Sequence, residues 1–150
     1  MTGGLDDLYQ ELILEHSRKP HNHHALEGAT HQAEGYNPLC GDRVKVQLRV
    51  GEDAIADAAF TGTGCAICTA SASMLTEQLK GQSRDDAAAL FERFHTLLTE
   101  DDAEPDVDVL GDLAALGGVR RFPMRVKCAT LACHTAKAAL EDRGEPVTTE

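Results

Sequence analysis

The stretch "RVKVQLRV", residues 43–50, alternates apolar and polar side chains without a break. Successive side chains of a strand point to opposite faces, so this segment has one apolar face and one polar face. A sheet with one apolar face needs a layer of helices over it. Helical spacing of apolar residues recurs at 5–16, 65–81, 83–98 and 128–144. We therefore predict an α+β fold, with an antiparallel sheet of about three strands packed against helices.

Length and charge limit the number of domains and the kinds of partner. The chain has 150 residues, of which 42% are hydrophobic, with no internal repeat and no linker, so we expect a single domain over 1–150. Its net charge of −11 argues against nucleic acid and anionic membranes as partners, because both attract clusters of Lys and Arg. No apolar run reaches the length of a membrane span.

The N-terminal segment and the cysteines indicate a compartment. "MTGGLDDLYQELI" lacks the basic and apolar regions of a signal peptide, so we expect a cytoplasmic protein. Thiols stay reduced there, and the chain has five cysteines, an odd number. Metal ligands or a nucleophile are therefore favoured over a disulfide framework.

The five cysteines fall into two groups. Cys65 follows "GTG", and Cys128 follows a segment that we expect to be extended around Pro123. Each of the two cysteines begins a predicted helix, where the helix dipole favours a thiolate. Cys68 and Cys133 fall instead on apolar helical stripes. We expect these two to pack in the core as small apolar residues.

Cys40 has a different setting, in "NPLCGDR" just before the alternating strand. Cys40 and Asp42 are two apart, so in an extended chain they project to the same side and supply half of a metal site. A turn entering a strand is the simpler interpretation of "CGD" alone. Cys40, Cys65 and Cys128 are widely scattered, which fits a site assembled from several elements rather than a zinc finger.

Two other arrangements of the cysteines stay open at this point. Cys65, Cys68, Cys128 and Cys133 could form a four-cysteine site. The last two lie five apart on one predicted helix, about 140° around its axis, so we rank this site second. A thioredoxin-like role for "CAIC" is weaker, because no βαβ pattern precedes it.

The seven histidines give no clear site. The "HNHH" group at 21–24 and His31 lie in polar segments and are expected to be solvated. His16, His95 and His134 lie on predicted helices, where we expect ordinary surface or boundary residues.

Four segments carry a resemblance that covers nearly the whole chain. They are "LYQELILEHSRKPHNH", "NPLCGDRVKV", "GTGCAICTASASMLTEQLKG" and "GVRRFPMRVKCATLACHTAKAAL". Together they resemble the SufU-type members of the IscU-like (NifU N-terminal) family. The resemblance implies an antiparallel three-stranded sheet packed on helices. It also implies one Zn2+ ion, bound by Cys40, Asp42, Cys65 and Cys128.

The resemblance further implies an activity. SufU-type proteins are sulfurtransferases (transpersulfurases) that accept persulfide sulfur from a pyridoxal-phosphate cysteine desulfurase of the SufS kind. They feed iron–sulfur cluster assembly, so downstream assembly proteins are expected partners. In this scheme a histidine of the desulfurase displaces Cys40 from zinc, and the freed thiolate takes up the sulfur. Arg125 is expected to orient the partner or stabilise the thiolate; alternatively it is an ordinary surface arginine.

The alternatives within this resemblance are an IscU-type scaffold for a [2Fe–2S] cluster and a purely structural zinc protein. Two features favour the SufU type. Lys127 precedes Cys128 where scaffold proteins carry a histidine, and the segment 90–119 is longer than in the scaffold type. One departure from the family is Cys133, where many relatives have a tryptophan.

Overall fold

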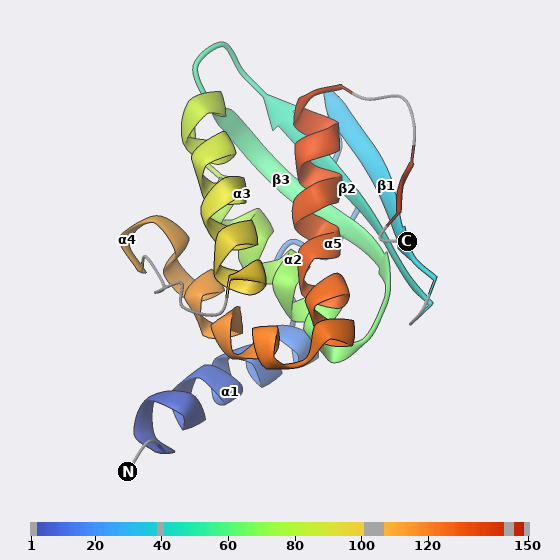
Figure 1. Cartoon of the computed structure of the whole chain (residues 1–150). Helices are drawn as coiled ribbons and strands as arrows, with labels where there is room; N and C mark the ends of the chain where they lie inside the picture. Colours follow the sequence, from blue (N-terminus) through green and yellow to red (C-terminus); the bar gives the residue numbers. More distant parts are fainter. Residues whose placement is uncertain (1–2, 39–40, 101–106, 143–145, 149–150) are drawn as a thin grey trace.

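The structure is a computed structural model that describes residues 3–38, 41–100, 107–142 and 146–148. A twisted sheet forms one layer, and helices cover one of its faces (Figure 1). The helix α1 (Gly3–Arg18) lies at one end of this helical layer, and the described chain ends beside the strand β1 (His31–Asn37). This arrangement confirms the predicted α+β class.

The sheet has four strands in the order β3-β2-β1-β4. The strands β1 (His31–Asn37), β2 (Asp42–Val50) and β3 (Ile55–Thr63) pair antiparallel, as predicted. The sequence pattern did not reveal β4 (Val147–Thr148), a two-residue strand that pairs parallel with β1 at the edge. The β1–β2 register places Asn37 opposite Asp42.

The alternation of β2 divides the two faces of the sheet as expected. Val44, Val46 and Leu48 are buried beneath the helices, while Arg43 and Arg49 on the opposite face are exposed. The helices α2 (Ala66–Leu79) and α5 (Pro123–Leu140) lie directly on the sheet. A Cβ atom at Gly35 would collide with Thr135 of α5, so glycine here lets the helix approach β1 closely.

Local signals fixed several helix ends. The helix α1 (Gly3–Arg18) stops before Pro20. The Ser83 side chain caps α3 (Arg84–Thr99) by accepting a hydrogen bond from the Asp86 N–H. Gly81 follows α2 with a φ of +84°, a conformation that glycine adopts without strain. None of the helices in the described ranges is both long and apolar enough to cross a membrane.

The segment before Cys128 differs from the prediction. The short helix α4 (Val107–Leu110) leads into the 3-10 helix η1 (Gly111–Arg121), and α5 begins directly at Pro123. We expected an extended segment around Pro123. A proline has no N–H to lose in the first turn, so here it starts a helix instead of interrupting one. Cys128 therefore lies in the second turn of α5, and the prediction that it begins a helix is wrong.

Candidate metal centre

Cys65 lies where β3 gives way to α2. It is the N-cap residue of α2, with φ −69° and ψ 170°, and its Sγ accepts a hydrogen bond from the Cys68 N–H at 3.5 Å. A thiol in this position faces the positive end of the helix dipole, as the sequence predicted. The side chain is half-buried, so it borders both the core and the surface.

Asp42 is the first residue of β2, and its carboxylate is buried with 1% exposure. It points to the helix-covered face because it shares the parity of Val44. Its Oδ1 accepts a hydrogen bond from the Cys65 N–H at 2.9 Å, and its Oδ2 accepts one from Asn37 Nδ2 at 3.0 Å. Each oxygen retains a lone pair, so the carboxylate is held without being blocked as a metal ligand.

Cys128 enters the site from α5. It is fully buried, and its Sγ lies 3.4 Å from Asn37 Nδ2, which donates toward it. The Met124 carbonyl one turn earlier lies 3.8 Å from the same sulfur. The packing of α5 across β1 and β2, and not a helix start, places this thiol opposite Asp42.

Asp42, Cys65 and Cys128 converge. One ligand atom from each lies within 4.8 Å of the others. In a tetrahedral zinc site the metal lies about 2.3 Å from sulfur and about 2.1 Å from oxygen, so neighbouring ligand atoms are about 3.5–3.8 Å apart. The donor set and spacing therefore fit such an ion after small side-chain movements. Cys40, the predicted fourth ligand, lies outside the described residues.

Arg125 stands at the exposed edge of this group. The charge of the Cys65 thiolate, followed by hydrogen bonding to Cys128, raises the pKa of the Arg125 guanidinium. This side chain therefore faces the two thiols from the solvent side, where a permanently charged group meets whatever approaches them.

A family model described as the NifU-like N terminal domain matches residues 8–129. The chain belongs to this family. Two relatives of this NifU-like domain are similarly close. The "Iron-sulfur cluster assembly scaffold protein IscU" of Streptococcus pyogenes serotype M1 is 39% identical, covering 91% of this chain and 85% of the relative. The "Zinc-dependent sulfurtransferase SufU" of Bacillus subtilis (strain 168) is 38% identical, covering 87% of each chain.

A solved structure agrees with both the family and the fold. The crystal structure of FiSufU from the thermophile Fervidobacterium islandicum AW-1 matches with a TM-score of 0.81 and 32% identity. The match covers 93% of this chain and 99% of that one. The resemblance to the IscU-like family is thus confirmed, whereas the relatives carry both scaffold and sulfurtransferase names.

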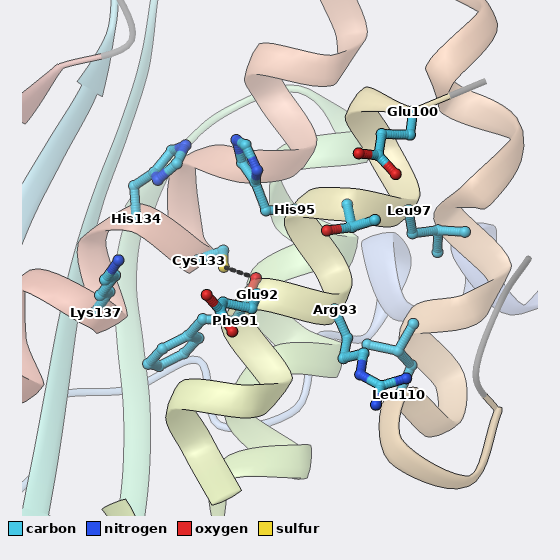
Figure 2. A pocket seen from close by; sticks show the side chains of 11 residues that line it. Phe91, Glu92, Arg93, His95, Leu97, Glu100, Leu110, Cys133, His134 and Lys137 are labelled. Carbon is cyan, nitrogen blue, oxygen red and sulfur yellow. Dashed lines mark hydrogen bonds between the residues drawn. The ribbon is translucent and has the colours of Figure 1, made fainter. Parts of the chain in front are cut away.

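The other two described cysteines of the NifU-like domain are core residues. Cys68 and Cys133 are each 3% exposed, as predicted. Figure 2 shows Cys133 at the base of a pocket between α3 and α5, with its Sγ directed at the Phe91 carbonyl 3.8 Å away. Burial raises the pKa of the Cys133 thiol to about 12. The three-ligand group found among the described residues contains neither cysteine, which weighs against the four-cysteine arrangement.

The group found among the described residues contains no histidine. His95 and His134 both line the same pocket and contact each other edge to face, with ring centroids 5.6 Å apart (Figure 2). Burial lowers the pKa of His134, and the neighbouring His95 and Lys137 lower it further. His16, expected at the surface or its boundary, is buried with 4% exposure, and its Nδ1 lies 2.7 Å from Ser73 Oγ.

Asn37 is the residue that the sequence analysis missed. It is fully buried and contacts two candidate ligands through one nitrogen. The available signal was positional: "NPLCGD" places Asn37 five residues before Asp42, the separation at which two paired strands meet across a short turn.

Proposed function

We propose that this NifU-like domain is a zinc-dependent sulfurtransferase of iron–sulfur cluster assembly, which accepts sulfur from a SufS-type cysteine desulfurase. The observation that carries the proposal is the convergence of Asp42, Cys65 and Cys128 within 4.8 Å. Cys40 completes the proposed ligand set. The Bacillus subtilis relative, named a zinc-dependent sulfurtransferase, supports the same choice. The proposed ligands and the sulfur acceptor are free thiols, which stay reduced in the cytoplasm, so we place this activity there.

Zinc suits such a site because it is redox-inert, keeps its thiolate ligands deprotonated and accepts ligand exchange. Three thiolates and one carboxylate provide four negative charges toward the ion. A carboxylate is a harder partner for zinc than a thiolate, so Asp42 keeps the set open to exchange.

Cys40 is the proposed sulfur acceptor. Its thiolate attacks the terminal sulfur of the partner's persulfide, so a new S–S bond forms on Cys40 as the S–S bond of the partner breaks. The partner regains a thiolate, and the exchange needs no external oxidant or reductant. Arg125, facing the thiols from the solvent side, is proposed to attract the anionic persulfide.

The surface around Arg125 supports the approach of a protein partner. Phe122 and Met124, which lie within three residues of Arg125, are 62% and 60% exposed, which is unusual for large apolar side chains. A groove continues from Phe122 and Arg125 past Ile67 to the α1 residues Ile13 and Leu14. A desulfurase bound here would lie next to Cys65, two residues from Ile67.

An IscU-type scaffold is the second candidate, because the Streptococcus pyogenes relative carries that name at a similar identity. Lys127 distinguishes the two in chemical terms. The ammonium of a lysine cannot bind a metal while protonated, whereas a histidine in its place would add a nitrogen ligand. A purely structural zinc site is the third candidate and predicts no effect on a desulfurase.

The deciding experiment combines metal analysis of the purified protein with a desulfurase assay. We expect about one zinc per chain, no visible absorbance after anaerobic reconstitution with iron and sulfide, and strong stimulation of a SufS-type enzyme. Mass spectrometry of the peptide containing "NPLCGDR" should show a gain of about 32 daltons on Cys40. A brown, cluster-bearing protein that leaves the desulfurase unaffected would favour the scaffold. Sulfur found only on Cys65 or Cys128, with Cys40→Ala still active, would reject Cys40 as acceptor.

A further inference from the structure

Asn37 occupies an unusual position at the end of β1. Its side chain is fully buried on the helix-covered face of the sheet, directly opposite Asp42 in the β1–β2 register. A buried amide needs partners for both hydrogens of its nitrogen, since an unmatched donor is costly away from water. Two acceptors lie within hydrogen-bonding distance of this nitrogen, and both belong to candidate metal ligands.

The two contacts reach across the fold. Nδ2 of Asn37 donates to Asp42 Oδ2 at 3.0 Å and lies 3.4 Å from Cys128 Sγ. Asp42 lies five residues away in sequence, whereas Cys128 lies 91 residues away on α5. One nitrogen therefore ties the strand that carries the carboxylate to the helix that carries the thiol.

We propose that Asn37 is a positioning residue of the metal centre, which fixes the Asp42 carboxylate and keeps Cys128 the least exchangeable of the thiolate ligands. This inference rests on the proposed metal binding but not on sulfur transfer. A second donor, the Cys65 N–H, holds the other oxygen of Asp42. With both oxygens held, the carboxylate cannot rotate, and its remaining lone pairs keep a fixed direction.

The effect on Cys128 follows from the charge on the sulfur. An N–H donor directed at a thiolate withdraws electron density, which makes the sulfur less basic and less nucleophilic. Cys128 is also fully buried, so neither a proton nor an incoming sulfur reaches it readily. Exchange is thereby directed to another ligand, and the metal stays attached while that ligand reacts.

Two variants and one control test this inference in the absence of any desulfurase. Asn37→Leu keeps nearly the same shape without a donor, and Asn37→Asp keeps the shape but replaces the donor by an acceptor. Ser71→Ala is the matched control: the Ser71 hydroxyl donates to the Ala129 carbonyl at 2.6 Å and also links α2 to α5, and among the described residues it bonds to no candidate ligand atom. Far-UV circular dichroism establishes which variants are folded.

The measured quantities are the rate of zinc transfer to a chromophoric chelator, the absorption spectrum with cobalt in place of zinc, and the alkylation rate of Cys128. We expect both Asn37 variants to release zinc about 10- to 100-fold faster, since outer contacts of metal ligands change affinity by that factor. Their cobalt spectra should shift and Cys128 should be alkylated faster, while Ser71→Ala resembles the unaltered chain.

Three outcomes overturn the inference. Release from folded Asn37→Leu at the unaltered rate would show that the donor is irrelevant. Equal acceleration in Ser71→Ala would indicate general loosening of the fold. If Asn37→Leu does not fold, Asn37→Asp decides, and an unchanged release rate and cobalt spectrum there would equally overturn it. If the unaltered chain binds zinc but stimulates no desulfurase, the proposed function fails while this inference remains testable.

Discussion

The Cys65 N–H donates a hydrogen bond of 2.9 Å to Oδ1 of Asp42. This contact joins the N-cap of α2 to the start of β2, across 23 residues of sequence. Gly64 makes it possible, because a Cβ atom at that position would lie 2.9 Å from Asp42 Oδ1 and 3.0 Å from Cys68 Sγ. Two of the candidate ligands are thus held together by the protein itself.

The first prediction separates ligand cysteines from core cysteines. Cys65→Ser and Cys128→Ser should lose zinc, while Cys68→Ala and Cys133→Ala should retain it, as measured by metal analysis of the purified variants. Loss of zinc should also lower thermal stability, because a ligand at a thousandfold excess over its Kd stabilises the folded state by about 4 kcal/mol. Zinc loss in Cys68→Ala together with retention in Cys40→Ala would return the four-cysteine site to consideration.

The second prediction concerns Gly64. An added methyl group has no room, so Gly64→Ala should displace the Asp42 carboxylate from the Cys65 N–H and weaken zinc binding. Overpacking of this kind costs about 1–3 kcal/mol. Gly118→Ala is the control, since nothing lies within 4 Å of a Cβ atom there. The zinc affinities of the two variants, measured by competition with a chelator, should differ, and equal affinities would contradict this account.

Local sequence patterns were sufficient to predict most of the fold. The alternation at 43–50 predicted β2 and its buried face, because strand periodicity depends only on neighbouring residues. The signals for helices starting at Cys65 and Ser83 were equally local. Pro123 misled the prediction, since a proline both stops a helix and starts one, and tertiary packing decides between the two.

The site was only partly predictable, because part of it depends on tertiary packing between residues far apart in sequence. Asp42 and Cys65 could be selected by residue type and by their place at an element boundary. The role of Asn37 depends on the β1–β2 register and on how α5 crosses β1, neither of which a local pattern specifies. The burial of His16 likewise depends on a contact with Ser73, 57 residues away.

The third prediction concerns Arg125, which is exposed and faces the thiols. Arg125→Ala should leave the free energy of unfolding nearly unchanged and leave zinc bound, but lower desulfurase stimulation. Arg121→Ala removes a neighbouring exposed charge and should lower it less. Added salt should reduce the difference between the unaltered chain and Arg125→Ala, because exposed charges are screened beyond about 8 Å at physiological ionic strength. Equal losses of desulfurase stimulation in both variants would show that Arg125 contributes only through the general surface charge.

The last prediction concerns Cys133 and high pH. Burial raises the pKa of this thiol from 9.0 to about 12, so the folded chain holds the proton more tightly than the unfolded chain does. The resulting stabilisation is fully present below pH 9.0 and is lost as the pH rises toward about 12. The loss amounts to at most about 1.4 kcal/mol per pH unit over that window. Urea unfolding of the unaltered chain and of Cys133→Ala at a series of pH values measures it, because the variant lacks the group that titrates. The free energy of unfolding should therefore fall less steeply above pH 9.0 in Cys133→Ala, and parallel curves would show that this thiol ionises without cost in the folded state.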